Sequence, residues 1–364
     1  MDKEKFKIWI KEIKRKTPIF LKNMQGNQRQ GFFKYSLSGD IFREHIKWGL
    51  GNAVFALKIY YTINYNPKNL NKIAEFIISF QKKNGEFYDP IVKYLSFPLR
   101  VFYSLRYNDF NNLNNQQTIR AETRQAFSAL NLFRFKPKYQ YLQFPKTEES
   151  IKNYLKSLNW NKPWGAASHF SHLLFFLSHS NIINKLKLID FAVNLVNKLQ
   201  HDDGCWYSGN PPLDQKINGS MKIITGLKVA TSIADYNNGE IYFDKAMNLI
   251  DTVLKATNDI HACDNFNITF VLKYANEITK NYRYNEIEKF FKNRLNIYMK
   301  YYYPKYGAFS FYPQRAKKSY YDALISKGKR EPDIHGTSLF LWGLSIIGDF
   351  WNLNETLKIN EYIS

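Results

Sequence analysis

The sequence contains few cysteines and no long apolar run. Cys205 and Cys263 are its only cysteines, too few for a disulfide scaffold or a four-cysteine zinc site, which is typical of a reducing compartment. The longest clean apolar run, around residues 173–177, falls far short of the roughly 18 residues that a membrane-spanning helix needs. Residues 1–14 are charged throughout, unlike a signal peptide. We therefore expect a cytoplasmic protein, with peripheral membrane contact as the alternative.

Acidic residues are scarce relative to basic ones. The chain of 364 residues has 52 Lys and Arg against 31 Asp and Glu, a formal net charge of +21. Such a surplus attracts polyanions, although lysine is spread along the whole chain beside abundant asparagine, as a compositional bias would also produce. The sequence lacks a recognition-helix module, a zinc finger and a single-strand-binding sheet signature. We expect an anionic small molecule or glycan as the partner, with an anionic membrane surface as an alternative and nucleic acid last.

The sequence also lacks the alternation of a half-buried strand. Apolar residues recur instead at three- and four-residue spacing almost everywhere, which predicts an all-α protein. Hydrophobic residues make up 45% of the chain and charged residues 23%, so a sizeable core can be buried.

Two kinds of predicted helix alternate along the chain. One kind is amphipathic and Lys-rich, with one solvated face: residues 3–15, 68–82, 147–158, 183–200, 240–256 and 283–300. The other kind is apolar, with small residues and few charges: residues 42–62, 118–133, 163–178, 217–232, 262–277 and 333–348. Starts near residues 118, 163, 217 and 262 give spacings of 45, 54 and 45 residues, typical of repeated helix pairs.

These alternating helices predict a single domain over residues 1–364, a closed (α/α)6 toroid with the apolar helices inside. An open solenoid would show the same periodicity. Residues 303–332 are too long for an ordinary connection and are expected to form a lid or rim loop.

Two segments place a glutamine before a glycine and then an aromatic residue: Gln200, Gly204 and Trp206, and Gln81, Gly85 and Phe87. A fragment of a third copy is Tyr306, Gly307 and Phe309. This pattern resembles the repeat of squalene and hopene cyclases, in which Gln and Trp side chains join an outer helix to the next turn. Residues 333–346 resemble the last inner helix of protein prenyltransferase β subunits. Over most of the chain the sequence thus resembles the terpenoid cyclase and protein prenyltransferase α/α-toroid superfamily, which implies the architecture.

The catalytic motifs of the resembled families are absent. No Asp-x-Asp-Asp acid motif and no Asp-Asp-x-x-Asp magnesium motif occurs, and Asp202 and Asp203 are the nearest pair. Prenyltransferases hold zinc with Asp, Cys and His, but the turn that would match reads Asn218, Gly219 and Ser220.

An alternative zinc triad has the right residue types: Asp203, Cys205 and His335. We expect no cofactor, with zinc at this triad or magnesium as the alternatives.

Polar residues gather at the N-terminal ends of the predicted inner helices. Arg120 and Arg124 are four residues apart on one helical face, which costs stability unless an anion or a carboxylate lies between them. A substrate anion, Glu122 or an acid of a neighbouring helix would each serve. His169 and His172 are three apart on one face, suiting either proton transfer or a buried structural role.

Asp333 is expected to be the N-cap of the last apolar helix. His335 then lies at the positive end of the helix dipole, which favours a neutral imidazole that can act as a general base. Other candidate substrate-binding residues at these helix ends are Gln125, Trp164, Asp203, Trp206, Asn218, Asp264 and Asn265.

Side chains of these types suit an acidic sugar. Arginine would neutralise the sugar carboxylate, histidine or tyrosine would remove the neighbouring proton, and tyrosine or glutamate would return one. We predict a carbohydrate-active enzyme of lyase or epimerase type in surface-polysaccharide metabolism, with these catalytic residues: His335, His172, His169 and Glu122.

Two alternatives have a different chemistry. The first is an isoprenoid cyclase or prenyltransferase-like enzyme that binds a prenyl diphosphate through its basic residues. The second is a non-catalytic basic scaffold on an anionic membrane, with a contact face in residues 3–15 made of Phe6, Trp9, Ile10 and Ile13.

Overall fold

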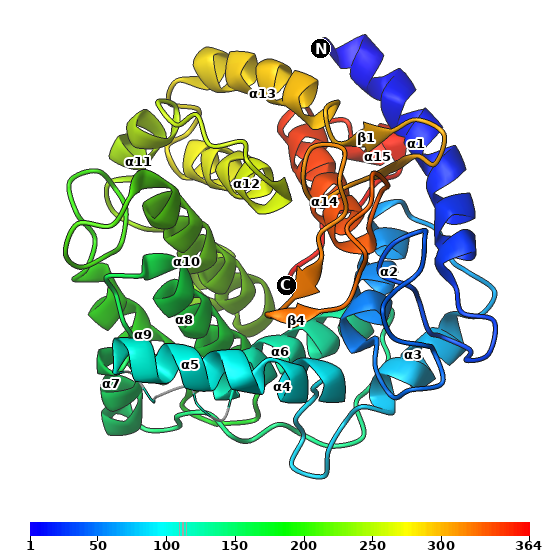
Figure 1. Cartoon of the computed structure of the whole chain (residues 1–364). Helices are drawn as coiled ribbons and strands as arrows, with labels where there is room; N and C mark the ends of the chain where they lie inside the picture. Colours follow the sequence, from blue (N-terminus) through cyan, green and yellow to red (C-terminus); the bar gives the residue numbers. More distant parts are fainter. Residues whose placement is uncertain (109, 111–112, 114) are drawn as a thin grey trace. The chain divides into compact units, whose positions relative to one another are not determined.

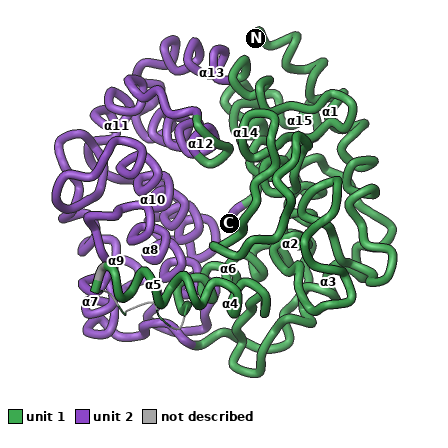
Figure 2. The backbone as a smooth tube through the Cα atoms, viewed as in Figure 1, with its two compact units in different colours: residues 1–142, 260–263, 295–362 green, residues 143–259, 264–294, 363–364 purple. Residues whose placement is uncertain are grey.

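The computed structural model describes residues 1–364 apart from 109, 111–112 and 114. The described chain is mostly helical, as predicted. It divides into two compact units (Figure 2). Unit 1 comprises residues 1–142, 260–263 and 295–362, and unit 2 comprises residues 143–259, 264–294 and 363–364.

Unit 1 contains apolar helices packed side by side. Helix α2 (Leu50–Thr62) packs against α6 (Gln116–Leu132) and against α14 (Ile334–Phe350). Nearly every residue of α2 and α14 is buried, as expected for the apolar kind of helix. The amphipathic α3 (Leu70–Ile78) packs on α2. Unit 1 also contains the following helices (Figure 1): α1 (Lys3–Met24), α4 (Pro90–Leu95), α5 (Phe97–Tyr107) and α15 (Asn354–Leu357).

Unit 2 repeats the pairing of apolar and amphipathic helices. The apolar α8 (Pro163–Ser178) packs along α10 (Leu213–Ala234), and α9 (Lys185–Asn197) packs against both α8 and α7 (Glu148–Lys156). The remaining elements are η1 (Tyr236–Gly239), α11 (Ala246–Val253) and most of α12 (Ala262–Ile278) and α13 (Tyr284–Tyr298). Within the described residues, every helix is too short or too polar to cross a membrane.

The segment 303–332 differs from the expected plain loop. Strand β1 (Tyr302–Tyr303) pairs with β2 (Ala308–Phe309), and β3 (Ser319–Tyr320) pairs with β4 (Ala323–Leu324), both antiparallel. In the second hairpin, Tyr321 and Asp322 take φ values of 42° and 64°, the two left-handed residues that suit a tight hairpin turn. Such two-residue strands are too short to show a period of alternation in the sequence.

Two predicted helix boundaries were also wrong. The helix expected over residues 42–62 begins only at Leu50, because Gly49 before it takes a φ of 94°. The N-terminal helix, expected near residues 3–15, continues to Met24 with Pro18 inside it.

Helix α1 packs on unit 1 through its apolar face. Phe6, Trp9, Ile10 and Ile13 are 0%, 5%, 2% and 1% exposed. The Trp9 ring contacts that of Phe309 at a centroid distance of 5.9 Å. The membrane-contact face predicted on this helix is therefore wrong, because the protein core covers it.

Two glutamine side chains join the turns that follow helices α3 and α9 to later segments of the chain. Gln200 Nε2 donates hydrogen bonds to the carbonyl oxygens of Gly204 (3.1 Å) and Asp244 (2.8 Å), just before α11. Gln81 Nε2 likewise donates to Gly85 O (3.3 Å) and to Tyr139 O (2.7 Å).

A further copy of this turn occurs where the sequence pattern is imperfect. Gln25 forms a bridge with Phe33, and its Nε2 lies 3.5 Å from Asn69 Oδ1 at the start of α3. Gly31 has a φ of +83°, and a Cβ there would lie 2.4 Å from Lys72 O. The close approach of turn and helix therefore requires glycine.

In two of these turns, a threonine of an apolar helix holds the backbone of the aromatic residue. Thr337 Oγ1 accepts a hydrogen bond from Phe309 N (3.0 Å) and donates one to Phe309 O (3.0 Å). Thr123 makes the same pair of bonds with Phe87, at 3.0 and 3.2 Å. These bonds fix helices α14 and α6 against the turns of unit 1.

Candidate functional site

Two carboxyl groups meet inside unit 1. The backbone N–H of Asp89 donates a hydrogen bond of 2.9 Å to Glu122 Oε2. The Asp89 carboxylate accepts hydrogen bonds from the N–H groups of Gly49, Leu50 and Ile91, and so caps both α2 and α4. Burial raises the pKa of Asp89 to about 6, although these donors favour its ionised form.

Glu122 is a buried carboxyl group with an unused oxygen. The residue is 2% exposed, and its Oε1 has no hydrogen-bond partner among the described residues. Burial, followed by the nearby Asp89 carboxylate, raises the pKa of Glu122 well above its usual value. A raised pKa favours the protonated form of this carboxyl group, and that form can act as an acid.

Arg124 is a buried guanidinium group beside phenols. It is 4% exposed, and its Nε has no hydrogen-bond partner among the described residues. Burial lowers its pKa to about 10, and the acidic groups that oppose this are phenols: Tyr320, Tyr321 and Tyr362. Within the described chain no carboxylate forms an ion pair with Arg124, and Glu122 is engaged with Asp89 instead. Of the alternatives expected for the arginine pair, a carboxylate partner is therefore not seen at Arg124, and a substrate anion stays a prediction.

The neighbours of Arg124 on α6 differ from it. Arg120 is only half-buried. The Gln125 side-chain oxygen accepts a hydrogen bond from the Lys58 ammonium group, which also lies 5.0 Å from the centre of the Tyr362 ring. Two buried cations, Arg124 and Lys58, therefore lie near Tyr362.

The groups around Glu122 and Arg124 form the cluster of unit 1. The β3–β4 hairpin adds two tyrosines to it. The Tyr320 and Tyr321 ring centroids are 4.5 Å apart. Burial raises both phenol pKa values, Glu122 raises them further, and Arg124 lowers that of Tyr321. Tyr320 packs so closely on α2 that a Cβ at Gly51 would lie 2.6 Å from its ring.

His335 reaches this cluster through Tyr320. Asp333 is the N-cap of α14, as predicted, and accepts a hydrogen bond of 2.7 Å from Gly336 N. The His335 ring stacks on Phe55 at 4.5 Å, and its Nδ1 lies 3.3 Å from the Tyr35 hydroxyl. The Tyr320 ring is 6.1 Å away, edge to face.

The predicted histidine pair occurs in unit 2. His169 and His172 of α8 are 6% and 2% exposed, with ring centroids 5.4 Å apart. His172 Nε2 lies 3.4 Å from the Ser168 hydroxyl, and the Tyr154 hydroxyl donates to the His169 backbone carbonyl (3.3 Å). Trp164 of the same helix is half-buried.

Amide side chains connect α10 and α12 within unit 2. Asn218 Nδ2 lies 3.5 Å from Asp264 Oδ1, and Asn267 Nδ2 donates to Asn218 Oδ1 at 2.6 Å. Asn265 instead accepts a hydrogen bond of 3.0 Å from Arg294 Nη1. This hydrogen bond joins Asn265, in the first turns of α12, to Arg294 of α13.

The remaining candidates, Asp203, Cys205 and Trp206, lie in the turn after α9. Asp203 Oδ2 accepts hydrogen bonds from the Lys216 ammonium group and the Tyr207 hydroxyl, both at 3.0 Å. Trp206 is fully buried, and burial raises the pKa of the Cys205 thiol to about 12. Asp203 and Cys205 belong to unit 2 and His335 to unit 1. Across the described residues, no three His, Cys, Asp or Glu side chains form a metal-binding group.

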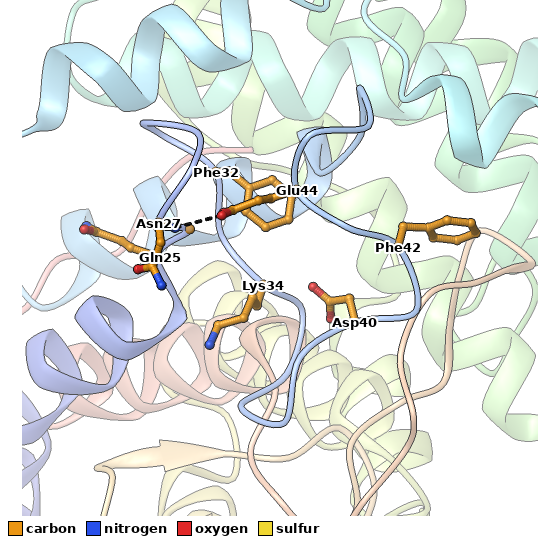
Figure 3. A pocket seen from close by; sticks show the side chains of 8 residues that line it. Gln25, Asn27, Phe32, Lys34, Asp40, Phe42 and Glu44 are labelled. Carbon is orange, nitrogen blue, oxygen red and sulfur yellow. Dashed lines mark hydrogen bonds between the residues drawn. The ribbon is translucent and has the colours of Figure 1, made fainter.

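A small pocket of about 150 Å³ lies near the first turn of unit 1 (Figure 3). Its Glu44 Oε1 accepts a hydrogen bond of 3.1 Å from Asn27 N, and Asp40 accepts one of 2.9 Å from Tyr35 N. The carboxylates that line this pocket therefore hold its own loop together.

Sequence reasoning missed several members of the cluster in unit 1: Tyr35, Lys58, Asp89, Tyr321 and Tyr362. Asp89 before Pro90 was a readable helix-start signal, but nothing local marks the other four. Neither a scan of protein-family models nor a search of curated proteins finds a match for this chain. Its function must be argued from its own residues.

Proposed function

We propose that unit 1 carries the active site of a carbohydrate-active enzyme that acts on an acidic glycan by proton abstraction, as a lyase or an epimerase. The observation that carries this proposal is Arg124, a buried guanidinium group whose acidic neighbours among the described residues are phenols. A uronic-acid carboxylate would supply the missing negative charge in the two-pronged geometry that arginine favours.

The neighbouring groups suit the rest of the reaction. When Arg124 neutralises the sugar carboxylate, the proton on the adjacent carbon becomes more acidic. His335, oriented by its contact with Tyr35, is the proposed base. In a lyase reaction, the C–H electron pair would form a C=C bond as the bond to the glycosidic oxygen breaks. Glu122, whose protonated form is favoured by its burial, would protonate that leaving oxygen. In an epimerase reaction, an acid would instead return a proton to the same carbon from the opposite face.

His169 and His172 of unit 2 are proposed as a second proton-transfer pair, on the observation that both are buried with their rings in contact. In this proposal, the side chains carry out every proton transfer and no cofactor takes part.

We also propose that the helices belong to an (α/α)6 toroid related to the terpenoid cyclase and prenyltransferase superfamily. The apolar and amphipathic rows within each unit support this. The glutamine side chains that join outer helices to the following turns support it as well. These features concern architecture and carry no argument for cyclase chemistry.

The test uses the purified full chain and a panel of uronic-acid oligosaccharides. Lyase activity would appear as ultraviolet absorbance of the new conjugated C=C bond, and epimerase activity as uptake of solvent deuterium at the carbon next to the carboxylate. Arg124→Met should abolish binding and turnover. Glu122→Gln should abolish turnover and preserve binding. Arg315→Met, at an exposed arginine that stacks on Tyr312, is the matched control and should do neither.

Prenyl diphosphates form the opposing arm of this test. If the protein binds only these and Arg124→Met abolishes that binding, the glycan proposal is overturned in favour of isoprenoid chemistry.

A further inference from the structure

Helices α4 and α5 present an apolar surface to solvent. Tyr94, Phe102 and Leu105 are 65%, 54% and 67% exposed. Other large exposed apolar residues of this pair are Leu95, Phe97, Leu99 and Tyr103. Such a contiguous apolar surface marks an interaction site more often than chance exposure does.

The exposed residues of α5 lie on one face of the helix. Leu99, Phe102, Tyr103 and Arg106 follow the spacing i, i+3, i+4 and i+7, which places them in one stripe. Ser104, on the opposite side, is only 6% exposed. The apolar stripe therefore points outward and the polar side inward, the reverse of a helix that packs on a core.

Hydrogen bonds hold the corner between α4 and α5. Arg100 Nη2 donates to the carbonyl of Lys93 (3.0 Å), Nη1 contacts the Ser96 hydroxyl, and Nε donates to Leu113 O (3.3 Å). Asp89 caps the start of α4. The apolar surface is thus formed in the free protein and needs no ordering on binding.

Basic groups border this surface. Between Asp89 and Asp109 the sequence contains Lys93, Arg100 and Arg106 and no acidic residue. The ammonium groups of Lys93 and Lys82 lie 4.5 and 4.8 Å from the centre of the Tyr88 ring.

The basic cluster extends further along unit 1. Burial is the main cause that lowers the pKa of Lys47. The positive charges of Lys82 and Arg29, which lie near it, lower this pKa further. An apolar face bordered by cations matches a surface with negative head groups above hydrocarbon.

We propose that α4 and α5 bind the surface of an anionic membrane. The stripe with Leu99 and Phe102, together with the exposed Leu105 beside it, enters the boundary between head groups and acyl chains, while Lys82 and Lys93 face lipid phosphates. A second copy of the same chain is a poorer occupant, because it would bring the same basic border against itself. The proposal is independent of the glycan chemistry in unit 1.

The test is flotation of the full chain with two kinds of vesicle, phosphatidylcholine alone and phosphatidylcholine mixed with phosphatidylglycerol. Binding is expected only to the mixed vesicles, and it should weaken with added salt, because the Debye length shortens from about 10 Å at 0.1 M to about 3 Å at 1 M. The double variant Phe102→Ser with Leu105→Ser should lose about tenfold or more in partitioning, since two large apolar side chains no longer enter the bilayer.

Matched controls separate this surface from general stickiness and general charge. Ile183→Ser with Ile260→Ser removes two other exposed apolar side chains, 103% and 70% exposed, and should bind like the wild type. Lys82→Glu with Lys93→Glu should weaken binding, whereas Lys255→Glu, at an exposed lysine elsewhere, should have a smaller effect. The circular-dichroism spectrum and melting curve show that each variant is folded.

Three results would overturn the proposal: no binding to the mixed vesicles, equal binding to both kinds of vesicle, or equal losses in the Phe102/Leu105 and Ile183/Ile260 variants. Self-association that the Phe102/Leu105 variant abolishes, without vesicle binding, would assign the surface to a second copy instead.

Discussion

Glu122 accepts a hydrogen bond of 2.9 Å from the backbone N–H of Asp89, whose own carboxylate lies close enough to raise the Glu122 pKa. One residue thus holds the other in place and at the same time disfavours its ionisation. This relationship connects the start of α4 to α6 and leaves Glu122 Oε1 without a hydrogen-bond partner among the described residues. It makes Glu122 the buried acid of the cluster.

The pH dependence of stability should report this raised pKa. Because the folded protein retains the Glu122 proton to a higher pH than the unfolded chain, its contribution is complete below the usual value of 4.5 and is lost as pH rises toward the folded value. Glu122→Gln lacks this titration. The free energy of unfolding of the wild type minus that of the variant should therefore fall by up to about 1.4 kcal/mol per pH unit.

Urea unfolding of both proteins between about pH 4 and pH 8 measures this difference. The exposed Glu75, which pairs with Lys72 at 2.9 Å, provides the control variant Glu75→Gln. A wild-type-minus-Glu122→Gln difference that stays constant across this range would show that Glu122 ionises normally.

Replacing Arg124 should stabilise the protein while removing its proposed anion site. A buried guanidinium group that no carboxylate neutralises keeps much of the free-energy cost of its desolvation. The same burial lowers the pKa of Arg124 to about 10. Arg124→Met keeps most of the side-chain volume and should raise the free energy of unfolding by about 1–3 kcal/mol. Chemical denaturation measures this, with the exposed Arg315→Met expected to change stability by less than about 0.5 kcal/mol. A loss of stability in Arg124→Met would indicate that the guanidinium group has a structural role.

Glycine is required where the turn after α9 meets α11. Gly204 has a φ of +78°, and a Cβ there would lie 2.4 Å from Leu249 N. Gly204→Ala should therefore lower the free energy of unfolding by about 2 kcal/mol or more. Gly165 in α8 is the matched control, because a Cβ there meets nothing within 4 Å. Gly165→Ala should gain up to about 1 kcal/mol from helix propensity. Equal effects in thermal melts would contradict this account of the turn.

Two buried threonines should respond oppositely to loss of their hydroxyl group. Thr337→Val removes the acceptor for Phe309 N and leaves that N–H buried without a partner, at a cost of about 1–3 kcal/mol. The Thr62 hydroxyl has no hydrogen-bond partner among the described residues, so Thr62→Val should be neutral or slightly stabilising. Urea midpoints of the two variants measure the contrast, and a Thr62→Val loss as large as that of Thr337→Val would refute it.

Much of the local structure followed from the sequence. The alternation of apolar and amphipathic segments placed helices such as α8 and α9 within a few residues of their observed bounds, because side-chain periodicity is set by the backbone itself. Asp333 was recognisable as an N-cap, because capping depends on a single side chain that accepts a hydrogen bond from a backbone N–H in the first turn of the helix. The Gln81 and Gln200 turns were also recognisable in the sequence, because the position of a glycine reflects the local backbone conformation.

Only the tertiary structure decided which residues meet and which faces are covered. The cluster of unit 1 joins Tyr35 to Glu122, Tyr320 and His335, residues that lie far apart along the chain, and no local pattern predicted that they would meet. Helices α1 and α5 both carry apolar residues, yet Phe6 is buried and Phe102 is 54% exposed. Periodicity specifies that a helix has an apolar face, whereas only the packing of distant elements determines whether protein covers that face.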